Sequence, residues 1–190
     1  MIEVRGDGQP ESRSGRLDRD RAALVVIDLQ ESLSPVIEGF DDVVSAASVA
    51  VQGAQLLGLP VVVTEQYPQG LGPTVAPLAA HLDNCVRLTK TVFAAPRAEG
   101  FDLGGRDQVL LCGIEAHVCV YQTAAALRGQ GVEVQVLEDA VGARSPLNRA
   151  VGLRRMYELG VAPSSTEMFL LELLGKAGTP EFREVQRLIT

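Results

Sequence analysis

The sequence has no tryptophan, only two histidines and three cysteines, and aromatic residues make up 4% of its 190 residues. The cysteines, Cys85, Cys112 and Cys119, are odd in number and scattered, so they form no disulfide framework of the kind that stabilises small secreted domains. The histidines, His81 and His117, lack zinc-ligand spacing. These shortages argue against both a disulfide-stabilised scaffold and a structural zinc site.

The sequence also lacks a long apolar run and an excess of basic residues. No apolar stretch reaches the roughly 20 residues that a membrane-spanning helix needs. The formal net charge of -7 provides no basic surface for nucleic acid. Residues 1–20 carry charges and glycines without the apolar stretch of a secretory signal. We therefore expect a cytoplasmic protein with a flexible leader over 1–20, one domain over 21–190, and no nucleic-acid or membrane partner.

Short runs rich in β-branched residues alternate with helical patterns along the chain. Continuous apolar runs such as residues 22–29 are typical of central strands that are covered on both faces. The strand candidates are residues 22–29, 59–66, 85–90, 108–114, 132–139 and 161–166. The alternation predicts an α/β protein with three α/β/α layers and a central, mostly parallel, Rossmann-like sheet of about six strands.

Three helix starts can be placed from residues that commonly cap helices. Asp41 and Asp42 stand where a cap is expected before residues 43–57, whose apolar positions recur at spacings of three and four. Ser145 precedes a proline at the first helical position. Ser164 and Glu167 fit a capping box at the start of the next helix.

Cys119 lies five residues beyond the strand candidate 108–114, after a tight turn and in or next to the first turn of a helix. Unpaired N–H groups and the helix macrodipole favour a thiolate there and could bind an oxyanion. The arrangement resembles a nucleophile elbow with cysteine in place of serine. The alternative is a small buried residue at a helix–sheet contact, which is our interpretation of Cys85 and Cys112.

Asp28 and Lys90 both end strand candidates, where open α/β sheets bind their ligands. A desolvated carboxylate has a raised pKa unless a cation compensates. Lys90 could hold Asp28 ionised, ready to accept the proton of Cys119. A structural ion pair and a helix cap remain alternatives. Glu65 and Asp139 also end strands, so position alone selects no single acid.

Three stretches in order, AALVVIDLQ, KTVF and LLCGIEAHVCV, resemble the signature stretches of the isochorismatase-like cysteine hydrolases. That superfamily includes nicotinamidases, carbamoyl-sarcosine hydrolases and isochorismatases. TEQYPQGLGPTV and ARSPLNRAVGLRRM are especially similar to its isochorismatase domain-containing subgroup. The resemblance extends from residue 21 to the C-terminus and implies an isochorismatase-like hydrolase domain.

The resemblance also implies roles for individual residues. Asp28 matches the family's acid, Lys90 its lysine and Cys119 its nucleophile, and the peptide bond between Ile114 and Glu115 matches one that is usually cis. The amides of Glu115 and Cys119 would form the oxyanion hole. The thiolate would attack an amide carbonyl, and water would hydrolyse the thioester. If Asp28 accepts the thiol proton, Asp28→Asn leaves Cys119 slow to alkylate near neutral pH.

The sequence departs from the nicotinamidase pattern after the second strand candidate. Nicotinamidases usually carry metal-binding histidines there, whereas this chain reads TEQYPQGLG. We therefore expect no metal and no cofactor. Leu33, Tyr67, Phe93 and His117 lie near the motifs and are candidates for binding a small-molecule substrate, with core or loop packing as the alternative for each.

Together these features favour a metal-independent cysteine hydrolase with a Cys-Asp-Lys triad, acting on a small amide or related C–N bond. The alternatives are an isochorismatase-type vinyl ether hydrolase, which needs no cysteine nucleophile, a non-catalytic binding or scaffold protein, and a thiol redox sensor. The apolar C-terminal helices could supply the interface of a homo-oligomer.

Overall fold

A single sheet of six parallel strands, in the order β3-β2-β1-β4-β5-β6, lies at the centre of the computed structural model, which describes residues 16–190. The strands are β1 (Ala22–Ile27), β2 (Val61–Gln66), β3 (Val86–Lys90), β4 (Gln108–Gly113), β5 (Glu133–Val141) and β6 (Ala162–Ser164). The predicted parallel α/β sheet is confirmed.

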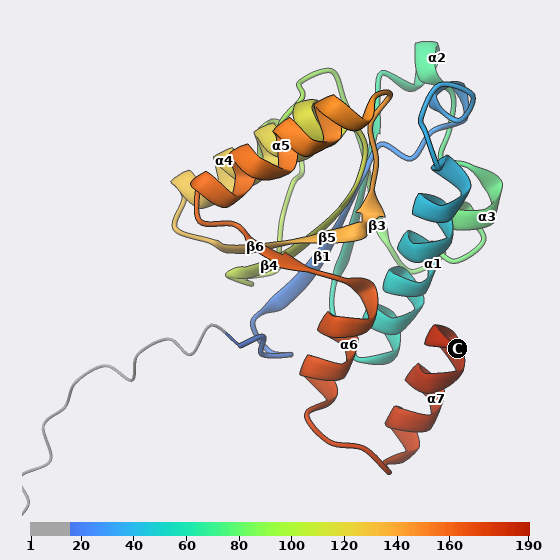
Figure 1. The fold of residues 1–190 in the computed structure, drawn as a ribbon, viewed down its shortest axis with the longest axis vertical. Helices are drawn as coiled ribbons and strands as arrows, with labels where there is room; N and C mark the ends of the chain where they lie inside the picture. Colours follow the sequence, from blue (N-terminus) through green and yellow to red (C-terminus); the bar gives the residue numbers. More distant parts are fainter. Residues whose placement is uncertain (1–15) are drawn as a thin grey trace, which may run out of the picture.

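Helices cover both faces of the sheet, which gives the expected three layers (Figure 1). One face packs against α1 (Phe40–Leu56), α3 (Ala76–Ala79), α6 (Thr166–Leu174) and α7 (Pro180–Ile189). The other packs against α4 (Tyr121–Gly129) and α5 (Pro146–Glu158). Short turns complete the chain: η1 (Glu31–Leu33), α2 (Pro68–Leu71), η2 (Ala95–Arg97) and the π-helical turn η3 (Ala116–Val120). Within residues 16–190, no helix is long and apolar enough to cross a membrane.

Strand β1 is the most deeply buried element of the sheet, with every residue from Ala22 to Ile27 fully buried. Its side chains alternate between the layers. Leu24 and Val26 join the apolar cluster under α1, whereas Val25 and Ile27 join the cluster under α4 and α5. Because β1 is packed on both faces, the position of Asp28, the residue that follows it, is also fixed.

The N-terminal caps of α1 and α5 differ in how well they match the predictions. The N-cap of α1 is Gly39, whose φ of 64° is left-handed, so the prediction that Asp41 and Asp42 cap the helix is wrong. Both acids lie in the first turn, where carboxylates favour the helix macrodipole. The cap of α5 is confirmed, because the Ser145 hydroxyl accepts a hydrogen bond of 3.2 Å from the Asn148 amide.

The cap of α6 lies one residue later than predicted. Ser165 is the N-cap, and its hydroxyl accepts a hydrogen bond of 3.2 Å from the Met168 amide. Ser164 is the last residue of β6. The predicted pairing of Ser164 with Glu167 is wrong because strand pairing with β5 continues through Ser164.

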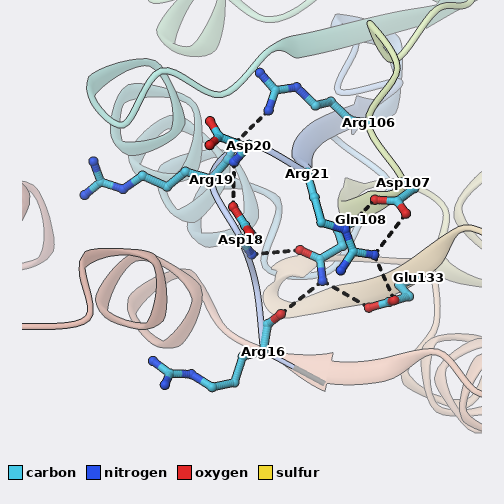
Figure 2. Close-up of polar contacts among 9 residues, drawn as sticks. All are labelled: Arg16, Asp18, Arg19, Asp20, Arg21, Arg106, Asp107, Gln108 and Glu133. Atoms are coloured by element: carbon cyan, nitrogen blue, oxygen red, sulfur yellow. Dashed lines mark hydrogen bonds and ion pairs between the residues drawn. The ribbon is translucent and has the colours of Figure 1, made fainter. Parts of the chain in front are cut away.

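A polar cluster at the opposite end of the sheet from the carboxyl ends ties the start of the described chain to the core (Figure 2). The Gln108 side chain accepts a hydrogen bond of 2.7 Å from the Asp18 amide and donates one of 3.0 Å to Glu133. Arg21 pairs with Asp107 at 2.8 Å and with Glu133 at 3.0 Å. Residues 16–20 of the expected leader are therefore bonded to the domain, and residues 1–15 lie outside the described part.

Candidate functional site

Asp28 stands immediately after β1, at the carboxyl end of the central strand. Its backbone is left-handed, with φ 54°, and its N–H donates a hydrogen bond of 3.0 Å to the Thr64 carbonyl. The Thr64 hydroxyl donates one of 2.7 Å to Asp28 Oδ1. Only 1% of Asp28 is exposed. Burial raises the pKa of the Asp28 carboxyl, and the charge of Lys90 opposes that rise.

Lys90 ends β3 and reaches past the end of β2 to Asp28. Its ammonium Nζ lies 2.7 Å from Asp28 Oδ2 and 2.7 Å from Gln66 Oε1. Both members of the ion pair are buried, with side-chain exposures of 0% for Lys90 and 2% for Asp28. Buried charges are costly unless they are paired and their remaining hydrogen-bonding positions are filled. Thr64 and Gln66 fill some of those positions.

Cys119 is a buried residue of η3, the π-helical turn between β4 and α4. Its thiol interacts with the Asp28 carboxylate and with Lys90. Burial first, and the negative charge of Asp28 second, raise the pKa of the Cys119 thiol to about 12, with Lys90 opposing. Desolvation of the sulfur and the charge of Asp28 thus oppose the thiolate that the start of the helix was expected to favour.

The turn before Cys119 has an unusual backbone. The peptide bond between Ile114 and Glu115 is cis. The Glu115 carbonyl accepts hydrogen bonds from the amides of Val118 at 2.9 Å and Val120 at 3.3 Å. It accepts none from the amide of Cys119, which lies between these two residues in the sequence. Within the described part of the chain, the Glu115 N–H donates no hydrogen bond. The Cys119 amide thus does not bond to the Glu115 carbonyl, and the Glu115 amide does not bond to a neighbouring loop.

Two glycines allow β1 and α5 to approach this turn closely. A Cβ on Gly113, whose φ is 116°, would lie 2.0 Å from the Ile27 carbonyl oxygen. A Cβ on Gly152 in α5 would lie 2.7 Å from the Ala116 carbonyl and 2.8 Å from the His117 nitrogen. Real Cβ atoms do not approach backbone atoms so closely, so both positions require glycine unless the backbone moves. The turn is therefore held from both sides.

The sequence matches the protein-family model for the isochorismatase domain over residues 22–168, a range that contains Asp28, Lys90 and Cys119. The chain belongs to the isochorismatase family. Isochorismatase domain-containing protein 2 from Macaca fascicularis is 42% identical over 178 residues, covering 92% of this chain and 86% of the relative. The family match places the chain in the isochorismatase-like hydrolase superfamily.

Solved structures share the isochorismatase fold along nearly the whole chain. MAR1 ribonuclease from Caenorhabditis elegans superposes with a TM-score of 0.86 and 37% identity, covering 92% of both chains. The YcaC gene product from Escherichia coli, an octameric hydrolase of unknown specificity, has a TM-score of 0.81 and 23% identity, and covers 92% of this chain and 87% of its own. The second likeness establishes the fold alone.

The four candidate substrate-binding residues of this isochorismatase domain have different environments. Tyr67 is exposed and lines a surface cavity of about 290 Å³ that Lys90 also lines. Phe93, in the turn after β3, is 49% exposed and lies outside the residues that line this cavity. Leu33 packs against the core under α1. His117 is half-buried, and its Nδ1 atom is buried without a hydrogen-bond partner among the described residues.

The structure also distinguishes Asp28 from Glu65 and Asp139, the other acids predicted to end strands, although β5 in fact continues to Val141. The Glu65 carboxylate accepts hydrogen bonds from the amide of Thr74 at 2.8 Å and from its hydroxyl at 2.7 Å. Asp139 accepts from the Thr166 amide, with both oxygens at 3.0 Å. Both acids hold loops or helix ends, and Asp28 alone among the three contacts Lys90 and the Cys119 thiol.

The polar partners that surround Asp28 and Lys90 in this isochorismatase domain were not predicted from the sequence. Thr64 and Gln66 lie two residues apart on β2, so they point to the same side of the strand. Their contacts with Asp28 and Lys90 could be predicted once β1 and β2 are known to be neighbouring strands. Thr64 pairs with Ile27 in the sheet and therefore lies beside Asp28, the next residue. Arg144, which pairs with Glu115 at 3.0 Å, was also missed. Among residues 16–190, no group of three or more acidic, histidine or cysteine side chains is arranged to hold a metal ion.

Proposed function

We propose that this chain is a metal-independent cysteine hydrolase that cleaves a small amide or a related C–N bond. Cys119 is the nucleophile, Asp28 carries the proton and Lys90 orients the carboxylate. The observation that carries the proposal is the burial of all three groups in mutual contact, with Lys90 Nζ 2.7 Å from Asp28 Oδ2. A buried ion pair next to a thiol is expensive to maintain, which supports a functional use.

The first half of the reaction forms a thioester. As the Cys119 sulfur attacks the carbonyl carbon, its proton passes to Asp28, whose raised pKa makes it a stronger base than an exposed carboxylate. Lys90 keeps the carboxylate ionised until then. When the tetrahedral intermediate collapses, the C–N bond breaks and the leaving amine takes the proton from Asp28. The carboxylate is thereby regenerated.

The second half hydrolyses the thioester with the same groups. Water gives a proton to Asp28 while its oxygen attacks the thioester carbonyl. The Cys119 sulfur then leaves and recovers that proton, so the acid product departs and the starting state returns. The backbone amides of Glu115 and Cys119 would bind the oxyanion in both halves. This assignment is supported by the Glu115 N–H having no acceptor in the described chain.

Assembly into a homo-oligomer is part of the proposal. Met168 and Leu171 of α6 are 55% and 37% exposed, so this helix presents apolar surface that a second copy could cover. The octameric YcaC protein of Escherichia coli shows that this fold can assemble. Size-exclusion chromatography with light scattering tests this part of the proposal, and a monomer at micromolar concentration would contradict it.

The test of the activity is a screen of small amides and ureido compounds with Cys119→Ala beside the wild type. Cys119→Ala should lose turnover and keep its unfolding temperature. The matched control is Cys85→Ala, because Cys85 is half-buried and remote from Asp28, and it should keep full activity. A chelator should leave the activity unchanged, and mass spectrometry should detect an acyl adduct on Cys119.

Retained turnover in Cys119→Ala would contradict the thioester mechanism. It would favour the vinyl ether alternative, which needs no cysteine nucleophile. RNA belongs in the same screen because a relative is named as a ribonuclease. RNA cleavage in place of amide cleavage would overturn the substrate class, although the net charge of -7 argues against it.

A further inference from the structure

Glu115, a proposed oxyanion donor, is joined to the loop between β5 and α5 by Arg144. The Arg144 backbone N–H donates a hydrogen bond of 2.9 Å to Glu115 Oε2. The Arg144 Nε donates to both carboxylate oxygens, at 3.0 and 3.1 Å. The Glu115 side chain is only 10% exposed, whereas that of Arg144 is 59% exposed. A mostly buried carboxylate is therefore held by a guanidinium at the surface.

These contacts occupy every polar group of Glu115 except its amide. The Glu115 carbonyl accepts from the amides of Val118 and Val120. The carboxylate accepts from Arg144 through both oxygens. Within residues 16–190, the N–H of Glu115 donates to none of the neighbouring groups. A residue that is fixed through its carbonyl and its side chain, and whose amide is unused, is a preorganised donor.

Backbone hydrogen bonds bring the two loops together beside this residue. The Gly142 amide donates to the Gly113 carbonyl at 3.2 Å, and the Ala116 amide donates to the Gly142 carbonyl at 2.8 Å. Arg144 follows Gly142 by two residues, so its side chain starts next to the turn that carries Cys119. The ion pair therefore adds a side-chain link to a junction that the backbone already defines.

We propose that Arg144 is a positioning residue for the oxyanion hole. By holding the Glu115 carboxylate, it keeps the Glu115 amide aimed at the place where the substrate oxygen becomes negative. The inference rests on the proposed function, because an oxyanion forms only if Cys119 attacks a carbonyl. Small displacements of groups that contact the transition state slow reactions strongly, whereas half-exposed ion pairs contribute little to stability.

Two reagents that react with the same sulfur separate this role from a structural one. p-Nitrophenyl acetate acylates Cys119 through a tetrahedral oxyanion and releases p-nitrophenolate. Methyl methanethiolsulfonate transfers a methylthio group to the thiolate, forms a disulfide, releases methanesulfinate and builds no oxyanion. Arg144→Ala should slow acylation of Cys119 about tenfold or more. It should leave the rate of disulfide formation unchanged.

The matched control is Arg187→Ala, which removes the arginine of an exposed pair with Glu184 in α7, remote from the turn. This variant should react like the wild type with both reagents. Methylguanidinium added to Arg144→Ala should restore part of the acylation rate, because it can occupy the emptied position beside Glu115. Glu115→Gln should reproduce the selective loss of acylation, and it provides the test if Arg144→Ala does not fold.

Equal acylation rates in Arg144→Ala and wild type would overturn the inference. An equal slowing of both reactions would also overturn it, because that result indicates a general effect on the sulfur or the fold. If the wild type itself is not acylated on Cys119, the proposed function fails. That outcome is distinct from a failure confined to Arg144.

Discussion

Replacing Asp28 by asparagine should speed the alkylation of Cys119 and, at the same time, abolish hydrolysis. In the wild type, burial first and the charge of Asp28 second raise the pKa of the Cys119 thiol, and Lys90 opposes them. Asp28→Asn removes the negative charge and leaves the ammonium of Lys90, so the thiol pKa falls. This prediction is opposite to the sequence-based expectation that the variant alkylates slowly, because alkylation needs only the thiolate whereas hydrolysis needs a proton acceptor.

The size of the effect follows from the thiolate fraction. With a pKa of about 12, the fraction of Cys119 thiolate at pH 8 is on the order of 10⁻⁴, against roughly a quarter for an exposed thiol with a pKa of about 8.5. Removing a unit charge in contact with the sulfur changes its ionisation free energy by about 1.4 kcal/mol or more, even with strong screening. Alkylation of Asp28→Asn at pH 8 should therefore be about tenfold faster or more.

The assay is alkylation with iodoacetamide at a series of pH values, with each cysteine read separately by mass spectrometry. Cys85 and Cys112 serve as internal references, because burial raises the pKa of both thiols and neither contacts Asp28. Slower labelling of Cys119 in Asp28→Asn would refute the reasoning. So would a wild-type Cys119 that labels with an apparent pKa below about 8.5.

Two further predictions concern stability. Gly113→Ala would place its Cβ 2.0 Å from the Ile27 carbonyl oxygen, so it should lower the free energy of unfolding by about 3 kcal/mol or more in urea denaturation. The control, Gly129→Ala in α4, has no atom within 4 Å of its new Cβ, and a loss there equal to that of Gly113→Ala would refute the steric argument. The raised pKa of Cys119, about 12, means that the folded state retains a proton that the unfolded state loses above about pH 8.5, so stability falls as pH rises through that window. Cys119→Ser should lose less stability than the wild type between about pH 9 and about pH 11 in thermal melts, and equal losses would contradict this burial argument.

The sheet could be predicted from the sequence because its strands are nearly continuous apolar runs. Residues 22–27 and 108–113 are buried on both faces, so their composition alone indicates central parallel strands. The same pattern predicted Asp28 and Lys90 at the ends of strands, whereas the roles expected of these residues and of Cys119 came from the resemblance to the family. Capping residues were less predictable, since Ser164 and Ser165 are chemically equal and only the extent of β6 decides between them.

The electrostatics of the site could not be predicted from local sequence. The start of a helix favours a thiolate, but the burial of Cys119 depends on how the turn packs against β1 and α5, which no local pattern specifies. Thr64 and Gln66 were missed for a related reason. Their role depends on β2 lying between β1 and β3, and therefore on the strand order. The Arg144–Glu115 pair likewise joins residues 29 positions apart in the chain.

The burial of the Cys119 sulfur also affects how readily this cysteine is oxidised. Peroxide oxidises thiolates much faster than thiols, so a sulfur that keeps its proton at rest is protected from sulfenic and sulfinic acid formation. A redox sensor needs the opposite property, namely an exposed sulfur that ionises readily. Cys119 should therefore be oxidised by peroxide more slowly than an exposed cysteine at the same pH.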